Sequence, residues 1–189
     1  MTETGLDAAD LDAFDAVVYD LDGTLVRLAV DWEAVARDAV DLFAEEGVEI
    51  EEADLWAMLD LAEEHDLRER LEAVIAAHER EGARRSDRLP LAERLPDHGV
   101  PLGVCSLNAE DACREALATH DLAPHVRTVV GRDSVERRKP DPEPLLATLR
   151  ELGVDPGDAV FVGDSARDEE AARRAGVAFR YVDGAPSDR

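Results

Sequence analysis

The most constraining feature of this chain is a short apolar run that ends at two aspartates. Residues 16–25 read Ala-Val-Val-Tyr-Asp-Leu-Asp-Gly-Thr-Leu, so Asp20 and Asp22 end the run and Gly23 follows them. A short apolar run stopped by glycine predicts a strand buried on both faces, as in a parallel sheet. Ligands of open α/β sheets bind just beyond the carboxyl ends of such strands. The run therefore predicts an α/β fold with two carboxylates at its ligand-binding edge.

Further short apolar runs, most of them rich in valine, recur later in the chain. They fall at about residues 101–105, 126–130, 159–163 and 177–182, with helical patterns between the later ones. This alternation predicts a parallel sheet with helices on both faces. One helix is expected to start at Pro142 after a cap at Asp141 and to end near Gly153, and the helix after Asp164 is expected to end at Gly176. Because the ends of parallel strands share one edge of a sheet, we expect the polar residues that follow these runs to converge.

The segment between the first two runs is too long for a simple crossover between parallel strands. Apolar residues recur at helical spacing over residues 32–43, 55–62 and 67–78. This spacing predicts about three amphipathic helices that form a small helical insertion after the first strand. The expected division is a Rossmann-like core of residues 1–27 and 87–189 and an inserted α-helical cap of residues 28–86.

Several cap residues could be taken for ligand contacts. Trp32, Trp56 and Met58 are expected in the apolar core of the cap instead, and His78 is expected to be packed or half-exposed. Two cap arginines are candidates for substrate contacts, although solvated positions on the helix surface are the simpler interpretation; they are Arg68 and Arg70.

Arginine greatly outnumbers lysine among the basic residues of the chain. Lys and Arg total 21, and Lys139 is the only lysine among them. Lysine provides a compact point charge with rotatable donors, whereas arginine provides a rigid fork. A site that needs one small cation between carboxylates and a phosphoryl group favours lysine. Chance retention of a lysine on a loop is the alternative interpretation.

The chain is strongly acidic, with 45 Asp and Glu and a formal net charge of −24. An excess of acid of this size opposes compaction unless salt screens it, and it keeps the surface hydrated. We interpret it as adaptation to a high-salt cytoplasm. Nucleic acids and anionic membranes are not expected as partners, because both require basic patches. A monomer or a homodimer is expected.

The remaining composition also favours a soluble cytoplasmic protein. Cys105 and Cys113 do not resemble a secreted disulfide framework and are expected to be reduced thiols in the core. Residues 1–15 lack the basic and then apolar pattern of a signal peptide. No apolar run approaches the roughly 20 residues that a membrane-spanning helix needs.

Polar residues follow four of the predicted strands, and together they resemble the motifs of a known superfamily. Asp20-Leu-Asp22-Gly23-Thr24 follows the first run, Ser106 the second, Lys139-Pro-Asp-Pro lies beyond the third, and Gly163-Asp164-Ser165-Ala-Arg-Asp168 follows the fourth. In this order they resemble the haloacid dehalogenase-like (HAD) hydrolase superfamily, in its phosphatase branch near the phosphoglycolate phosphatase-like proteins. The resemblance covers nearly the whole chain beyond residue 14.

The resemblance implies a role for each principal residue. Asp20 would be the nucleophile that forms an aspartyl-phosphate, and Asp22 the general acid and then the general base. Mg²⁺ would lie between Asp20, Asp164 and the main-chain carbonyl of Asp22, because it prefers hard oxygen ligands. Ser106 would donate to a phosphoryl oxygen, and Lys139 would neutralise charge on Asp20 and the phosphoryl group.

Supporting roles are implied for four neighbouring residues. Gly23 and Thr24 fit a tight turn that directs main-chain N–H groups at phosphate. Asp168, next to Ser165, would orient Asp164, a bound water or Lys139, unless it is only a first-turn acid stabilised by the helix dipole. The implied activity is hydrolysis of a small phosphomonoester, phosphoglycolate-like or a sugar phosphate.

Some alternatives stay open. Ser106 could cap the following helix, although Asn108 fits that cap better, and Leu107 stands where many relatives have a polar residue. Arg27 could meet substrate or be solvated. The same motifs also fit a phosphomutase and, less well, a non-catalytic phosphate-binding module, whereas Asp22 argues against a dehalogenase. The chain has no phosphate loop, no nucleophile elbow and no zinc spacing of its histidines.

Overall fold

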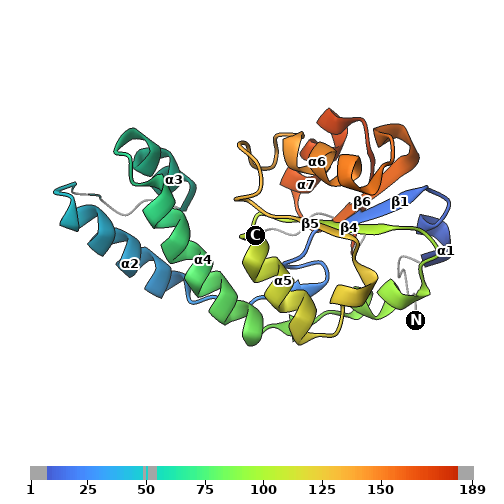
Figure 1. The fold of residues 1–189 in the computed structure, drawn as a ribbon, viewed down its shortest axis with the longest axis horizontal. Helices are drawn as coiled ribbons and strands as arrows, with labels where there is room; N and C mark the ends of the chain where they lie inside the picture. The colour runs from blue at the N-terminus through green and yellow to red at the C-terminus, as the bar shows by residue number, and fades with distance from the viewer. Residues whose placement is uncertain (1–7, 49, 51–54, 183–189) are drawn as a thin grey trace.

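A five-stranded parallel sheet forms the centre of the molecule (Figure 1). The computed structural model describes residues 8–48, 50 and 55–182. The strand order is β5-β4-β1-β6-β7, and every neighbouring pair is parallel. The predicted apolar runs supply these strands: β1 (Ala16–Tyr19), β4 (Leu102–Cys105), β5 (Thr128–Val130), β6 (Ala159–Gly163) and β7 (Ala178–Tyr181). The predicted α/β class with a Rossmann-like parallel sheet is confirmed.

Helices cover both faces of this sheet (Figure 1). Helices α6 (Glu143–Leu152) and α7 (Ala166–Ala175) lie on one face, and α5 (Glu110–Thr119) lies on the other. Short elements complete the layers: α1 (Ala8–Leu11) and the 3-10 segments η1 (Pro90–Asp97), η2 (Ala123–His125) and η3 (Pro156–Asp158).

Strand β1 shows why the sheet needs two helical layers. Its side chains alternate between faces. Val17 and Tyr19 belong to the apolar cluster that includes Leu117 of α5, while Val18 belongs to the cluster that includes Leu145 of α6. All of these side chains are buried. The central strand is therefore apolar throughout, and its first polar side chains lie beyond its carboxyl end.

The ends of the two helices on the α6 face were predicted from single residues. Gly153 ends α6 and Gly176 ends α7, and both adopt the left-handed conformation, with φ of 76° and 72°. The predicted start of α6 is shifted by one residue, because Pro142 is the N-cap. Asp141 still caps the helix, since its Oδ1 accepts a hydrogen bond from Glu143 N at 3.0 Å.

Three helices lie between β1 and β4, to one side of the sheet (Figure 1). The antiparallel pair β2 (Val26–Arg27) and β3 (Asp87–Arg88) flanks them, next to the predicted boundaries of the cap, residues 28–86. Their buried faces form an apolar cluster separate from those of the sheet. The helices are α2 (Trp32–Glu45), α3 (Leu55–Glu64) and α4 (Arg68–Arg84).

The side chains of these helices correct one prediction. Met58 is buried, as expected, but Trp32 at the start of α2 is 46% exposed, so its predicted place in the core is wrong. The physical reason is its position in the first turn, beyond the end of the buried stripe that begins at Val35. His78 is partly buried and contacts Asp38 Oδ2 at 2.7 Å. The side chain of Trp56 lies outside the described residues.

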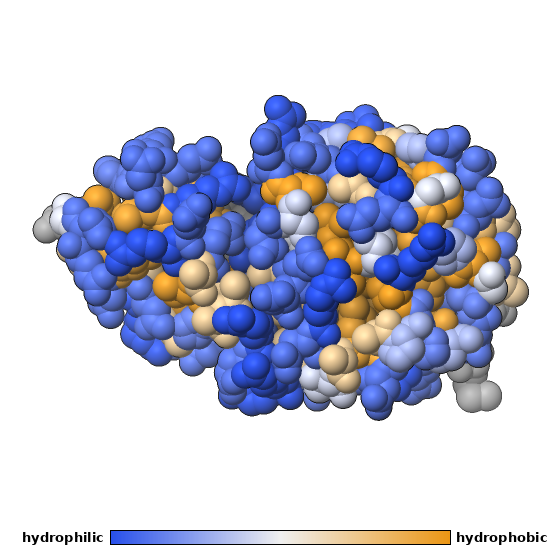
Figure 2. Space-filling view, in the orientation of Figure 1, coloured by the Kyte–Doolittle hydropathy of each residue, from blue (hydrophilic) through white to orange (hydrophobic). Residues whose placement is uncertain are grey.

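The surface agrees with the acidic composition. Figure 2 shows hydrophilic residues over most of one face, with apolar residues between them mainly over the part that contains the sheet. Within the described part of the chain, no helix combines the length and the apolar composition needed to cross a bilayer.

Candidate active site

Four of the predicted site residues meet at the carboxyl edge of the sheet. Asp20 follows β1, Ser106 follows β4 and Asp164 follows β6, while Lys139 comes from the loop between β5 and α6. They line a cavity of about 360 Å³. The crowding is possible because strands β1, β4 and β6 are neighbours in the sheet order, so their ends lie side by side.

Lys139 is the centre of this group. Its Nζ donates to Asp20 Oδ1 at 2.9 Å, to Asp168 Oδ1 at 2.5 Å and to the main-chain oxygen of Cys105 at 3.0 Å. Burial lowers the pKa of Lys139, but the carboxylates of Asp168 and Asp20 outweigh burial and the pKa lies above its usual value. Three acceptors therefore match the three hydrogens of an ammonium group.

Asp168 serves two purposes that the sequence left as alternatives. Its Oδ2 accepts hydrogen bonds from Ser165 Oγ at 2.6 Å and Ser165 N at 3.1 Å, which forms a capping box at the start of α7. Its Oδ1 contacts Lys139. The helix cap thus holds the carboxylate in the orientation that fixes the ammonium group.

The acidic residues of the site are mutually repulsive. Burial raises the pKa of the Asp20 carboxyl to about 7; the ammonium of Lys139 opposes this rise, and the carboxylates of Asp168 and Asp164 add to it. Ligand atoms of Asp20, Asp164 and Asp168 all lie within 4.8 Å of one another. Carboxylates so close together are stabilised by a cation between them.

The donor set and the local backbone fit a divalent cation. Carboxylate oxygens are the ligands that Mg²⁺ prefers. Gly23 has a φ of +87°, and a Cβ there would lie 2.3 Å from Asp164 Oδ2. Glycine is therefore required for the Asp164 carboxylate to approach the turn after β1. The absence of a side chain at Gly23 leaves space for the Asp164 carboxylate beside Asp20.

The second aspartate of the first motif also lines the cavity. Asp22 Oδ1 accepts a hydrogen bond from Leu28 N at 2.9 Å. Leu28 is the first residue of the predicted cap segment. The carboxylate of Asp22 is thereby held by the connection that leads to α2.

The prediction for Gly23 and Thr24 is wrong in one respect. Their main-chain N–H groups do not point at a phosphate position, because Gly23 N donates to Val26 O at 2.8 Å and Thr24 N donates to Leu21 O at 3.2 Å. These bonds close the turn that leads into β2. The Thr24 side chain is fully buried, and its Oγ1 has no hydrogen-bond partner among the described residues.

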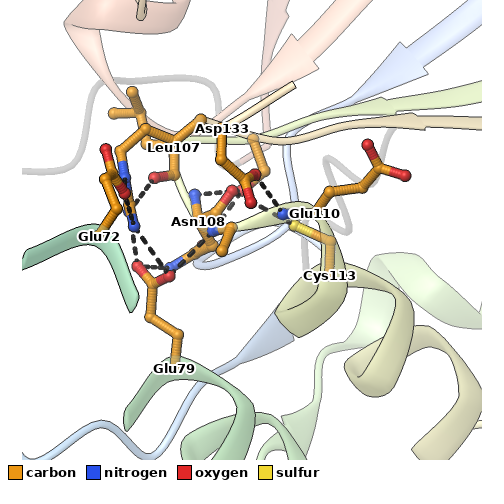
Figure 3. A network of polar contacts seen from close by, with 10 residues as sticks. Glu72, Glu79, Leu107, Asn108, Glu110, Cys113 and Asp133 are labelled. Atoms are coloured by element: carbon orange, nitrogen blue, oxygen red, sulfur yellow. Dashed lines mark hydrogen bonds and ion pairs between the residues drawn. The ribbon is translucent and has the colours of Figure 1, made fainter. Parts of the chain in front are cut away.

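Ser106 is buried beside the same cavity and is bonded to Asn108. Its Oγ donates to Asn108 Oδ1 at 3.1 Å and accepts from Asn108 N at 3.2 Å. The prediction that Asn108 caps α5 is wrong, because Ala109 is the N-cap. Acidic residues from elsewhere satisfy the first N–H groups instead: Ala109 N donates to Glu79 at 2.9 Å, and Glu110 N donates to Asp133 at 2.7 Å (Figure 3).

Sequence reasoning missed two buried charged residues that line the cavity. Glu79 of α4 is 1% exposed, and Arg132 beyond β5 is 3% exposed. Nη1 of Arg132 donates to Glu79 Oε1 at 2.8 Å. Asn108 Nδ2 donates to the same oxygen at 3.1 Å (Figure 3). Two signals could have found them. Glu79 continues the buried stripe of Leu71 and Ile75 at intervals of four, and Arg132 follows the end of a strand.

The arginines that the sequence singled out lie elsewhere. Arg68 pairs with Glu63 at 2.9 Å, and Arg70 pairs with Glu45 at 3.0 Å, on the exposed surface of the inserted helices. Neither lines the cavity at the strand ends, and Arg27 is exposed in β2. Trp32, in contrast, lines this cavity.

Comparison with known proteins assigns the family. The model of the haloacid dehalogenase-like hydrolases matches residues 17–182, which is most of the chain. The chain therefore belongs to this family, which confirms the resemblance of its motifs. Two curated relatives are phosphatases, which is consistent with a phosphoric monoester hydrolase, the class of enzyme that the motifs predict.

The phosphoglycolate phosphatase of Rhodospirillum rubrum is 44% identical over 89 residues, which is 47% of this chain and 37% of that protein. The N-acetylmuramic acid 6-phosphate phosphatase of Pseudomonas aeruginosa is 32% identical, and the match covers 88% of this chain and 81% of that protein. A HAD-superfamily hydrolase structure from Geobacter sulfurreducens has a TM-score of 0.61 and 30% identity, with 88% of each chain covered. The chain thus spans less than half of the first relative's length and most of the other two.

Proposed function

We propose that this protein is a Mg²⁺-dependent phosphatase that hydrolyses a small phosphomonoester through an aspartyl-phosphate intermediate. The observation that carries the proposal is the ammonium of Lys139, held between Asp20 and Asp168 beside Asp164 at the edge of the sheet. The relatives act on phosphoglycolate and on a sugar phosphate according to their names. Both names support a small phosphomonoester as the substrate.

Asp20 is the proposed nucleophile. A carboxylate oxygen of Asp20 attacks phosphorus, the bond from phosphorus to the leaving oxygen breaks, and water later cleaves the aspartyl-phosphate. Lys139 holds Oδ1 of Asp20 at 2.9 Å and directs the other oxygen toward the reacting atom. This contact also lowers the energy of the ionised nucleophile, which burial raises.

Asp22 is the proposed general acid and base. Its carboxyl donates a proton to the leaving oxygen, and the resulting carboxylate then accepts a proton from the attacking water. The hydrogen bond from Leu28 N to Oδ1 holds the Asp22 carboxyl in place at the edge of the cavity. Ser106 donates its hydroxyl hydrogen to a phosphoryl oxygen once substrate displaces the bond to Asn108.

The proposed cation site consists of the carboxylates of Asp20 and Asp164 and the main-chain carbonyl of Asp22. An Mg²⁺ ion held by these groups would supply positive charge next to the phosphoryl oxygens. The close approach of Asp164 to Gly23 supports this site. Asp168 is proposed to stay outside the set, because both of its oxygens already accept hydrogen bonds from Lys139 and Ser165.

The experiment is a panel of phosphomonoesters in molar KCl, with and without Mg²⁺. Release of phosphate that requires Mg²⁺ supports the proposal. A phosphomutase would instead transfer the phosphoryl group to a sugar hydroxyl, so product analysis separates the two activities. No release of phosphate from any member, with Mg²⁺ present and a folded protein, contradicts the proposed reaction and favours a binding module. The acidic surface further supports action in a high-salt cytoplasm, as a monomer or homodimer.

A further inference from the structure

One wall of the cavity comes from the inserted helices and the neighbouring loops. Its composition differs from that of the site residues at the strand ends. Glu79, Asn108 and Arg132 form its polar part, with Leu107 and Trp32 beside them. This wall lies where the leaving group of a phosphomonoester would extend when its phosphoryl group is at Asp20. Its chemistry therefore decides which leaving groups fit.

Arg132 is the cation of this wall, but its donors are already used. Nε donates to Glu72 at 2.9 Å, Nη1 donates to Glu79 at 2.8 Å and to Leu107 O at 2.7 Å. Nη2 reaches Glu79 at 3.3 Å and Glu72 at 2.9 Å. Hydrogen bonds thus engage four of the five N–H groups of the guanidinium, and Nη2 is also ion-paired with Glu72. Each nitrogen of Arg132 is therefore already bound to a carboxylate of the protein.

The cluster is also net acidic. Two carboxylates, Glu72 and Glu79, surround one guanidinium, which leaves a formal charge of −1. The three hydrogens of Lys139 are likewise engaged by protein acceptors. A substrate carboxylate in this wall would therefore meet a net negative cluster whose cation is already bound to protein carboxylates, so desolvating it would be costly.

The wall provides better contacts for a neutral leaving group than for an anionic one. The Nδ2 of Asn108 has two hydrogens, and Glu79 accepts one of them. Trp32 is 46% exposed and lines the cavity, so its aromatic face is accessible to the C–H groups of a polyol or sugar. A hydroxyl group can pair with an amide without bringing a charge into the wall.

We propose that this cavity selects phosphomonoesters whose leaving group is uncharged and carries hydroxyl groups, such as polyol or sugar phosphates, over those with a second anion, such as phosphoglycolate. The inference rests on the proposed phosphatase function and narrows its substrate class. Arg167, a further cation that lines the cavity, is exposed in the first turn of α7.

The test uses two substrates matched in size, one anionic and one neutral, and a larger neutral sugar phosphate. The values of kcat/KM for phosphoglycolate, 2-hydroxyethyl phosphate and ribose 5-phosphate are compared with Mg²⁺ in molar KCl. We expect both neutral leaving groups to be favoured over phosphoglycolate by at least about tenfold, which corresponds to about 1.4 kcal/mol. Turnover that favours phosphoglycolate overturns this inference alone, whereas turnover of none of the three by a folded protein overturns the proposed function as well.

A charge variant tests whether the wall is the cause. Glu72→Gln removes the net charge of the cluster at a position that is only partly buried. We expect it to raise the ratio of kcat/KM for phosphoglycolate to that for 2-hydroxyethyl phosphate by about threefold or more. Glu69→Gln, an equal change at an exposed position of the same helix, should leave the ratio unchanged. Equal ratios in all three proteins contradict the proposal.

Arg167→Ala completes the test. If the wall determines selection, this variant leaves the preference for neutral leaving groups in place. A loss of phosphoglycolate turnover by tenfold or more in Arg167→Ala, with neutral substrates unaffected, would show that an exposed guanidinium binds the second anion. That outcome contradicts the inference.

Discussion

Two buried cations of this molecule have similar surroundings and different consequences. Lys139 is held by two carboxylates and one main-chain oxygen, and so is Arg132. Around Arg132 every guanidinium nitrogen is bound to a carboxylate, and the two acids exceed the one cation by a single charge. Around Lys139, Asp164 is a third carboxylate, so three acids face one ammonium group. This excess of negative charge at the strand edge fits the proposed divalent cation, whose charge would offset the repulsion among the acids and between them and a phosphoryl group.

The largest effect is expected at the Lys139 site, where three acids face one ammonium group. Asp20→Asn should lower kcat by at least about a thousandfold, because an amide oxygen is a poor nucleophile while the contact with Lys139 can persist. Phosphate release measures it, and circular dichroism reports the fold. Asp158→Asn, which removes one negative charge at an exposed position, is the control. Turnover near the parental rate in Asp20→Asn would exclude Asp20 as the nucleophile.

The next largest effect is expected at the cluster of Arg132, Glu72 and Glu79. Arg132→Met should lower the free energy of unfolding by about 3–5 kcal/mol, because it leaves the buried Glu79 carboxylate without its counterion. Urea denaturation in molar KCl measures this loss. The double variant Arg132→Met/Glu79→Leu should be more stable than the single variant, because the fully buried Glu79 carboxylate is gone and only the partly exposed carboxylate of Glu72 is left without a counterion. A double variant that is less stable than Arg132→Met would contradict this account.

Exchanging lysine and arginine at positions 139 and 132 tests whether the two clusters differ in function. Lys139→Arg should lower kcat by about a hundredfold or more, because a planar fork cannot match acceptors arranged around a point charge. Its stability should change less than its activity. Arg132→Lys should show the reverse pattern, with a larger loss of stability than of kcat. Similar activity losses in both variants would mean that the two clusters do not differ in function.

A smaller effect is expected at Ser165, whose hydroxyl holds the Asp168 carboxylate. Ser165→Ala removes a helix cap and should cost about 1 kcal/mol of stability. It should also lower kcat, since the hydroxyl holds the carboxylate that fixes Lys139. Ser165→Thr keeps the hydroxyl and should restore both quantities. Full activity of Ser165→Ala would show that the main-chain bond alone is sufficient.

The smallest effect concerns salt. The stability of the parental protein should rise with KCl, because the repulsion among its exposed acids is screened. The stability difference between Arg132→Met and the double variant should change little, because buried charges are screened much less. Urea midpoints from low to molar KCl measure both. A parental protein equally stable in dilute buffer would contradict the high-salt interpretation.

The parts of the fold that follow from short-range patterns were predicted well. Apolar runs fixed the five strands, and Gly153 and Gly176 fixed the ends of two helices, because these features depend on a few neighbouring residues. The strand-end residues Asp20, Ser106 and Asp164 were expected to converge for the same reason. Their catalytic roles stay predictions until the variants above are measured.

Predictions failed where a side chain had several possible partners. Asn108 has the chemistry of a cap but bonds to Ser106 and Glu79, while acids from α4 and from the loop after β5 serve the start of α5. The main-chain N–H groups of Gly23 and Thr24 are used by their own turn. In both cases, the sequence shows the donors and acceptors but not which of them are close enough to pair.

The sequence by itself determined the parallel sheet and the order in which acids and one lysine reach its edge, because the alternation of strands and helices is local and the strand ends must share a side. Only the tertiary structure decided that Glu79 of α4 and Arg132 beyond β5 meet, since 53 residues separate them and no local pattern relates their positions. The physical reason is that a buried charge needs a partner in space, and the fold brings that partner from a distant part of the chain.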